Sequence, residues 1–570
     1  MNDILARRAI LRGGALGAMG LGLTGMFPAW AQTGTSGLQA DPTTVSGEDI
    51  QLRIARDTFT VGGRTGRAIT MNGVLPAPIV RLKEGQDVRL HIENTLDEDS
   101  SIHWHGLILP FQMDGVPGVS FPGIRPRSTF TYEFKVKQNG TYWYHSHSGL
   151  QEQQGHYGPI VIDPLGTDPV AHDREHVIVL SDWTFLNPHS LIMKLKQQGG
   201  YFNRQKQTLL GRTPADGENG MTAKERRMWA QMRMDPTDIA DVTASTYTYL
   251  VNGHGPTENW TGLFRPGERV RLRIVNAAAM TIFNFRIPGL RMTVVASDGQ
   301  NVRPVVVEEF QIGNAETYDV IVEPTENIAY TIVAESIDRS GMGRATLAPR
   351  LGMVAAVPPL RKRPTLTMKD MGMGDMDMSG GMAGMNMRDK SLVPKSVKVG
   401  VGVDAIAMVP TDRTGEPGLG LEDVGHKVLT YQDLVSLTPN PDPRPPARTV
   451  EVHLTGNMER FMWSFDGRKY SEGAEPLRFE RNERVRVVLI NHTMMTHPVH
   501  LHGHFFEVVT GNPGHHPLKH TVNVLPGAKV AFDLTADAPG DWAFHCHLLL
   551  HMHAGMFRVV TVRPLDGEKA

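Results

Sequence analysis

The chain has 570 residues, a formal net charge of −2 and 58 Lys and Arg against 60 Asp and Glu. Its length exceeds what one hydrophobic core usually supports, and its near-neutral charge gives no reason to expect nucleic acid or a charged membrane as partner. The 59 Gly and 38 Pro, with many short Val, Ile, Thr and Phe runs, indicate a β-rich chain with many turns.

The first predicted element is an export signal over residues 1–31. Arg7-Arg8 precede a weakly apolar stretch from Gly13 to Phe27, and Ala29-Trp-Ala31 offers a cleavage site. This is a twin-arginine arrangement, and its apolar stretch is too short to span a bilayer. An N-terminal anchor or a disordered tail is the alternative. Since no later segment approaches eighteen apolar residues, we expect a soluble periplasmic protein exported by the twin-arginine route, without a membrane span.

The chain then repeats itself, which predicts the fold class. Three segments each read as a turn followed by a strand of alternating apolar residues that ends at Asn. They are Glu84–Asn94, Pro266–Asn276 and Arg481–Asn491. We therefore expect an all-β protein of three related β-sandwich domains.

The first and third copies continue alike, and the middle copy does not. Ile102–Gly106 matches Val499–Gly503, and Gly140–His147 matches Gly540–His547. The middle copy has Thr281–Phe285 where the histidines would fall. We expect the outer domains to carry the chemistry and the middle one to be a spacer that binds no metal. The predicted boundaries are 45–165, 173–350 and 430–562, with a helical insertion near 222–234 and a Met-rich linker or loop at 359–425.

Four histidine-rich segments lie at the ends of the matched strands. Neutral imidazole suits copper, and thiolate with thioether selects it further. One His-x-His pair is weak support, but four segments at corresponding positions favour a metal centre over satisfied surface or core histidines. The segments are His103-Trp-His105, His145-Ser-His147, His497–His502 and His545–Met556.

Strand geometry separates these donors into two sites. Side chains alternate between the faces of a strand, with i and i+2 about 7 Å apart on one side. His545 and His547 should therefore point one way and Cys546 the other. Two His, one Cys and a weak axial Met make a blue-copper electron-transfer site, which His497, His551 and Met556 would complete. Cys546 is the single cysteine, so it cannot form an internal disulfide.

The motifs His-x-His-Gly, His-x-His, His-x-x-His-x-His and His-Cys-His-x-x-x-His-x-x-x-x-Met resemble, in content and order, those of the multicopper oxidases. The resemblance implies three tandem cupredoxin-like Greek-key sandwiches and four copper ions. It implies one-electron oxidation of a substrate coupled to the four-electron reduction of dioxygen to water. By resemblance, the type 1 copper takes His497, Cys546, His551 and Met556; the type 2 copper takes His103 and His500; the type 3 pair takes His105, His145 and His547 on one ion and His147, His502 and His545 on the other.

The chain is similar, more narrowly, to the periplasmic copper-resistance oxidases of bacteria. The supporting segments are the signal, Ser101–Pro110, Met113–Gly118, Met232–Asp241 and the Met-rich loop. This resemblance implies Cu(I) as substrate, oxidised to Cu(II), with electrons entering through a partly exposed edge of His551. Dioxygen, a small reducing substrate and periplasmic copper-handling proteins are the expected partners.

The Met-rich loop is the segment with the most unusual composition. Thioethers bind Cu(I), and neighbouring aspartates could attract cations, so we interpret the loop as a flexible site that gathers cuprous ions. A disordered linker in which Met is incidental is the alternative. The methionines are Met368, Met371, Met373, Met376, Met378, Met382, Met385 and Met387.

Asp114 is the third expected catalytic residue, beside Cys546 and His551. In related oxidases an acid at its position relays protons to the cluster; an Asp-Gly turn residue is the alternative. Met552 stands where some copper-oxidising relatives carry an acid. Further histidines are expected on the surface rather than as ligands, namely His504, His515, His516, His520 and His553.

Three functions remain open from the sequence. A cuprous oxidase is favoured. A copper-sequestering protein, whose benefit is binding rather than turnover, would rely on the Met-rich loop. A laccase-type phenol oxidase would need an aromatic-binding pocket near His551, and Fe(II) could also donate electrons.

Overall fold

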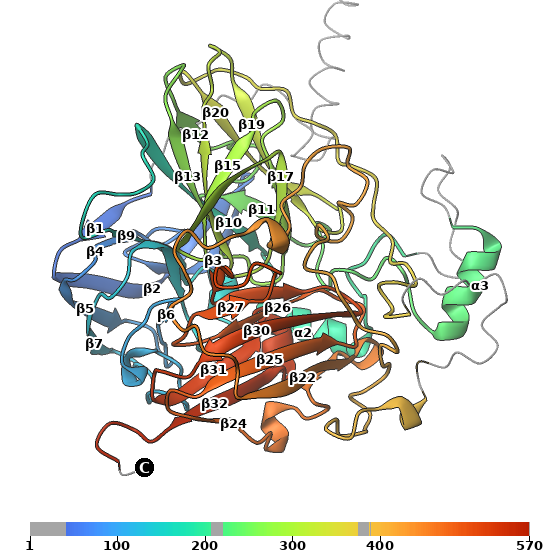
Figure 1. The fold of residues 1–570 in the computed structure, drawn as a ribbon. Helices are drawn as coiled ribbons and strands as arrows, with labels where there is room; N and C mark the ends of the chain where they lie inside the picture. The colour runs from blue at the N-terminus through green and yellow to red at the C-terminus, as the bar shows by residue number, and fades with distance from the viewer. Residues whose placement is uncertain (1–41, 207–220, 374–386, 388, 569–570) are drawn as a thin grey trace, which may run out of the picture.

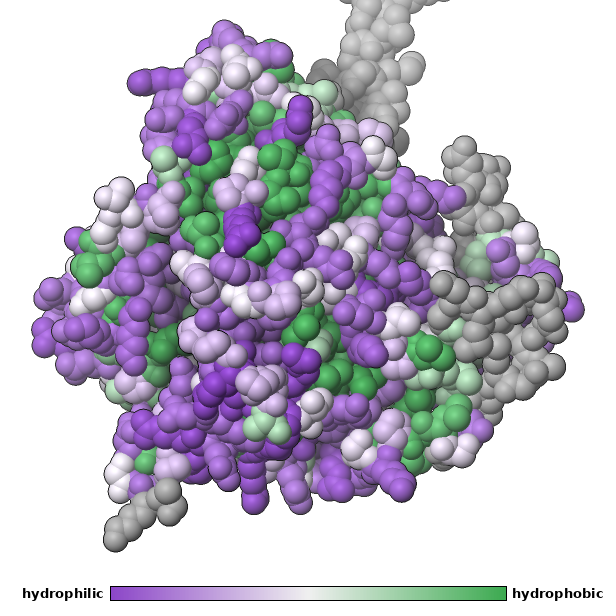
Figure 2. Space-filling view, viewed as in Figure 1, coloured by the Kyte–Doolittle hydropathy of each residue, from purple (hydrophilic) through white to green (hydrophobic). Residues whose placement is uncertain are grey.

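The computed structural model describes residues 42–206, 221–373, 387 and 389–568. The predicted export signal and Met376, Met378, Met382 and Met385 lie outside the described residues. Among the residues that are described, no helix is long and apolar enough to cross a membrane. The visible face in Figure 2 is mostly hydrophilic, with apolar side chains in small separate areas.

The predicted all-β class is confirmed, because the described residues form three pairs of β-sheets (Figure 1). The first sandwich (44–163) has a five-stranded sheet and a four-stranded sheet. In spatial order the strands are β1 (Thr44–Ser46), β4 (Ile79–Lys83), β9 (Tyr157–Asp163), β8 (Gly140–His145) and β6 (His103–His105), then β3 (Arg64–Met71), β2 (Asp49–Val61), β5 (Asp87–Asn94) and β7 (Ser128–Lys135).

The second sandwich (174–348) has a six-stranded and a five-stranded sheet. The first is β11 (Thr248–Val251), β10 (Arg174–Trp183), β13 (Val270–Asn276), β18 (Thr317–Val322), β15 (Met292–Ser297) and β16 (Gln300–Val307). The second is β12 (Thr261–Leu263), β20 (Met342–Ala348), β19 (Tyr330–Ser336), β14 (Phe283–Arg286) and β17 (Glu309–Ile312).

The third sandwich (448–563) carries the C-terminal histidine segments. One sheet is β23 (Met462–Phe465), β22 (Arg448–Asn457), β25 (Arg484–Asn491), β30 (Ala528–Thr535), β27 (Phe506–Val508) and β28 (Leu518–Lys519), with β21 (Thr411–Asp412) added on β30. The other is β24 (Leu477–Glu480), β32 (Phe557–Arg563), β31 (Gly540–Cys546), β26 (His497–Leu501) and β29 (Thr521–Val524).

In the described part of the chain, three short α-helices lie outside the sheets. They are α2 (Pro188–Gln197), α3 (Ala223–Met232) and α4 (Leu549–Ala554). The Thr222 hydroxyl accepts from the backbone N–H of Glu225, whose carboxylate accepts from the N–H of Thr222, so a capping box begins α3. In Figure 1, α3 lies at the side of the molecule beside loops rather than on a sheet.

The repeated strands β5, β13 and β25 occupy the same place in each sandwich. Each pairs in parallel with an earlier strand and antiparallel with a later one. The asparagine that ends each repeat is fully buried, and its side-chain amide donates to backbone carbonyls of the following turn. In the third sandwich, Asn491 binds the carbonyls of Met495 and Val524 at 2.7 and 3.0 Å, which fixes the turn that leads into β26.

We expect Asn276→Ala to destabilise the second sandwich by about 1–3 kcal/mol, because it leaves buried carbonyls of Thr281 and Ile312 unpaired. The midpoint of urea unfolding checks this. Asn139→Ala, at a part-buried bond to Glu84, is the control and should shift the midpoint by much less. Equal midpoints for the two variants would contradict the role of Asn276.

Candidate metal centre

Two separate groups of donor atoms lie in the third sandwich and at its contact with the first. The smaller group contains His497 of β26, Cys546 of β31 and His551 of α4, each fully buried. Cys546 Sγ is 3.4 Å from His497 Nδ1 and 3.8 Å from His551 Nδ1, and the two nitrogens are 3.2 Å apart. Met556 is also fully buried. It lies beside these residues, because its N–H donates to the His551 carbonyl and its own carbonyl accepts from the Cys546 N–H.

The larger group contains eight histidines from strands β6, β8, β26 and β31 and the residues that follow them. In the first sandwich His103 lies opposite His145, and in the third His500 lies opposite His545. The ligand atoms form three sets whose members lie within 4.8 Å of one another. The sets are His103, His105 and His500; His105, His145 and His547; and His147, His502 and His545.

Strand alternation produces the predicted division at the His-Cys-His run. His545 Nε2 lies 3.0 Å from His502 Nε2 and 3.3 Å from His147 Nε2, within the larger group. Cys546 faces the smaller group instead. The two groups are thus joined by adjacent residues of one strand, which gives a short covalent path between them.

Ring nitrogens without partners indicate what the larger group is built to hold. Among the described residues, the following buried nitrogens have no hydrogen-bond partner: His103 Nε2, His105 Nδ1, His145 Nε2, His500 Nε2 and both nitrogens of His547. Buried nitrogens normally find a partner, because an unpaired one costs about 1–3 kcal/mol. Several unpaired nitrogens in one cluster therefore fit a metal that accepts their lone pairs.

The opposite nitrogens of the same rings are held by hydrogen bonds. His103 Nδ1 donates to the Asp114 carbonyl at 2.8 Å, and His145 Nδ1 lies 2.7 Å from the Glu152 carboxylate. His500 Nδ1 donates to the His520 carbonyl at 2.6 Å. Such contacts fix the ring orientation and leave Nε2 free for a metal.

Burial sets the protonation of these donors. Desolvation lowers the pKa of the clustered imidazoles, His105, His500 and His502 among them, so they are neutral and have free lone pairs near pH 7. The same burial raises the pKa of the Cys546 thiol. The thiolate therefore needs a cation beside it, which a copper ion would supply.

Asp114 lies inside the larger group. Its side chain is 1% exposed, and Oδ2 is 2.8 Å from His502 Nδ1 while Oδ1 is 3.3 Å from His103 Nδ1. It follows the 3₁₀ turn Phe111–Met113, so it also has the turn position of the alternative interpretation. The geometry places it within hydrogen-bond reach of the centre.

The surroundings of His551 differ from those expected, and they include a residue that the sequence did not predict. The predicted partly exposed edge of His551 is wrong, because the side chain is 0% exposed. Its Nε2 donates to the carboxylate of Asp241 at 2.6 Å, and Asp241 belongs to the second sandwich. Trp463 also covers the ring, with centroids 3.9 Å apart. Asp241 is the last residue of the Met232–Asp241 segment. The similarity of that segment to the copper-resistance oxidases is the sequence feature that could have identified Asp241.

The prediction that the further histidines lie on the surface is also wrong for three of them. His504, His516 and His520 are buried, at 3%, 9% and 0% exposed. His520 Nδ1 lies 3.2 Å from His105 Nε2. Glu152, beside His145, was missed as well, and nothing in its spacing distinguishes it from a surface acid.

The described methionines of the Met-rich segment pack into a hydrophobic cluster beside α3. Met371, Met373 and Met387 are 3%, 1% and 7% exposed. Met494 is buried with them, and other methionines pack around the cluster, namely Met221, Met228, Met232, Met234, Met368, Met408 and Met458. The described ends of the Met-rich segment, at Met371, Met373 and Met387, are therefore packed into the protein.

A cavity of about 390 Å³ opens beside this cluster. Met234, Met458 and Met494 line it together with Asp235 and Asp238. Burial, together with the neighbouring carboxyl groups of Asp241 and Asp235, raises the pKa of Asp238 to about 7. Burial raises the pKa of Asp241 to about 8. We call this space the methionine cavity.

Comparisons with known proteins agree with this geometry. Three family models, each described as multicopper oxidase, match residues 53–166, 174–356 and 443–566. The chain is 49% identical to copper resistance protein A of Escherichia coli, over 98% of this chain and 99% of that protein. It is 48% identical to copper resistance protein A of Pseudomonas syringae pv. tomato, over 99% and 100%. The solved structure of a multicopper oxidase from Campylobacter jejuni has a similar fold, with a TM-score of 0.61, 18% identity and coverage of 94% of this chain and 96% of that one.

Proposed function

Because the chain belongs to the multicopper oxidases, which couple substrate oxidation to the reduction of dioxygen, we propose that its physiological substrate is Cu(I), oxidised to Cu(II). The name of the two relatives above, copper resistance protein A, supports a role in copper resistance. We also propose that residues 1–31 direct export to the periplasm by the twin-arginine route, as their composition indicates.

The donor groups support a four-copper assignment. When bound, the copper ions would take electrons singly from the substrate and together pass four to dioxygen, which with four protons from solvent gives two water molecules. His497, Cys546, His551 and Met556 would hold the type 1 ion, and His103 and His500 the type 2 ion. One type 3 ion would be held by His105, His145 and His547 and the other by His147, His502 and His545.

The observation that carries the choice of Cu(I) is the position of Asp241. Its carboxyl group lies 2.6 Å from His551 Nε2, and its proximity contributes to the raised pKa of Asp238 in the methionine cavity. A soft cation with thioether preference would be retained in that cavity and would lie near an acid that touches the type 1 ligand. His551 itself is fully buried, so an ion in the cavity would not contact it directly. Such an ion would instead act on His551 through Asp241, which hydrogen-bonds to it.

The test substitutes the cavity methionines Met234, Met458 and Met494 by leucine. Leucine conserves most of the volume and removes the sulfur, whereas deletion of residues 368–387 would also remove packed side chains such as Met371 and Met373. We expect KM for Cu(I) to rise about 10- to 100-fold, the range typical for a lost metal-site partner, while phenol oxidation is unchanged. Oxygen consumption with Cu(I) and with a phenol measures both.

Matched Met→Leu changes at Met342 and Met292, which are buried in the second sandwich, control for general effects of the substitution. Equal loss of both activities, or of neither, would sink the assignment of the cavity to Cu(I). Copper tolerance that persists without any oxygen consumption would favour the sequestering protein instead.

A further inference from the structure

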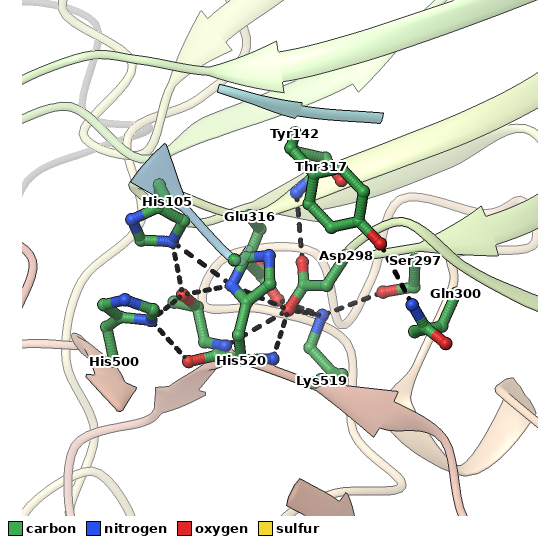
Figure 3. Close-up of polar contacts among 12 residues, drawn as sticks. His105, Tyr142, Ser297, Asp298, Gln300, Glu316, Thr317, His500, Lys519 and His520 are labelled. Carbon is green, nitrogen blue, oxygen red and sulfur yellow. Dashed lines mark hydrogen bonds and ion pairs between the residues drawn. The ribbon is translucent and has the colours of Figure 1, made fainter. Parts of the chain in front are cut away.

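A buried charged network joins the second sandwich to the third behind the histidine cluster (Figure 3). Asp298 and Glu316 come from the second sandwich and Lys519 from the third, and all three side chains are 0% exposed. Lys519 Nζ lies 3.1 Å from Asp298 Oδ2 and 3.0 Å from Glu316 Oε1. It also donates to Ser297 Oγ at 2.8 Å.

Asp298 does more than neutralise the lysine. Its Oδ2 accepts from the backbone N–H groups of His520 and Thr521, each at 3.2 Å. Its Oδ1 accepts from the N–H of Thr317 at 3.1 Å, which ties the carboxylate to its own sandwich. One carboxylate of the second sandwich thus binds the Lys519 side chain and the backbone of His520 and Thr521, where β28 ends and β29 begins.

The held segment contacts two predicted copper ligands. The His520 carbonyl accepts from His500 Nδ1 at 2.6 Å, and Thr521 Oγ1 lies 3.3 Å from the same nitrogen. On the other side, His105 Nε2 lies 3.2 Å from His520 Nδ1 and 3.4 Å from Thr521 Oγ1. On these two rings, the nitrogens without a hydrogen-bond partner are His500 Nε2 and His105 Nδ1.

The close approach of the His520 ring to the first sandwich depends on a glycine, Gly106. Gly106 has a φ of +81°, and a Cβ there would lie 2.6 Å from His520 Cδ2. Only glycine therefore fits between His105 and His520 without displacing the ring. The contact between the 519–521 segment and the first sandwich is tight, so a shift of that segment would move His105 and His500 together.

We propose that Asp298 is a positioning residue of the copper cluster: it fixes residues 519–521 so that His500 presents Nε2 and His105 presents Nδ1 to the metal. The proposal rests on the four-copper assignment but not on the identity of the substrate. It gives the second sandwich, which the sequence presents as a spacer, a structural part in the type 2 site.

The test is Asp298→Asn in the full-length, copper-loaded protein. Asparagine keeps the size of the side chain but loses the charge and one acceptor. We expect affinity for the type 2 copper to fall about 10- to 100-fold, as for other lost partners of metal ligands. Copper analysis should show about one ion fewer per chain, and the type 2 electron paramagnetic resonance signal should weaken, while the blue absorption of the type 1 site persists.

Glu316→Gln is the matched control. It removes a negative charge that pairs with the same lysine, but Glu316 does not bind the backbone N–H groups that Asp298 holds. It should keep the type 2 signal. If Asp298→Asn fails to fold, Thr521→Val tests the same contact through the lost hydroxyl and should perturb the type 2 signal. Unchanged copper content and type 2 signal in both Asp298→Asn and Thr521→Val, or equal losses in Glu316→Gln, would overturn the proposal. Since copper content is independent of the electron donor, a failure of Cu(I) oxidation in the unmodified protein would leave this test intact.

Discussion

Replacing Cys546 with serine is expected to abolish substrate oxidation while leaving the histidine cluster able to bind metal. The sulfur is the soft donor of the smaller group, 3.4 Å from His497 Nδ1 and 3.8 Å from His551 Nδ1. A serine hydroxyl is a hard, weakly acidic ligand and does not replace a thiolate at copper. His545 and His547 face the other way and keep their contacts, so the loss should be confined to one site.

Three measurements on the Cys546→Ser protein check this. The blue absorption should disappear, the type 2 signal should remain, and oxygen consumption with Cu(I) or a phenol should fall to background. Ser146 stands at the matching position of the first sandwich, and its hydroxyl bonds Gln151 rather than a donor group. Ser146→Ala is therefore the control and should stay blue. Residual turnover by Cys546→Ser would contradict the path through this cysteine, and unimpaired copper tolerance in cells would favour sequestration.

The sequence predicts the donor groups because each depends on a pattern within a short segment of the chain. Alternation along β31 is enough to separate Cys546 from His545 and His547, and the repeated strand ending at Asn is enough to place β5, β13 and β25 in equivalent positions. The matched histidine segments then follow in register on paired strands.

The residues that orient those donors could not be predicted in the same way. Asp241 is 310 positions from His551, and Asp298 is 222 positions from His520, so no spacing links them. Both come from the second sandwich, which has Thr281–Phe285 in place of the matching histidines and therefore reads as a spacer. The burial of His551 and His520 follows from the packing of that sandwich against the third, a tertiary effect that the pattern of either segment does not contain.

Asp241→Asn should reduce oxidation of Cu(I) about 10- to 100-fold and affect phenol oxidation less, in the range typical for outer partners of metal ligands. Asparagine still offers an oxygen to the His551 N–H, so the blue site should form. Burial raises the pKa of Asp241 to about 8, so its carboxyl group becomes anionic when an arriving cation displaces the proton; asparagine cannot become anionic and would not favour a cation from the methionine cavity, beside Asp238. Asp241→Ala also removes the hydrogen bond to His551 and should in addition shift the reduction potential of the type 1 site.

Steady-state oxygen consumption with each donor, and redox titration of the blue absorption, separate these effects. Glu459→Gln is the control: Glu459 lines the same cavity, but its side chain is 45% exposed and pairs with Arg233, where an ion pair contributes little. It should leave both activities unchanged. Equal losses with Cu(I) and phenol in Asp241→Asn would mean that Asp241 acts on the type 1 site in general. A loss confined to Cu(I) would tie the buried contact between Asp241 and His551 to the delivery of the metal substrate.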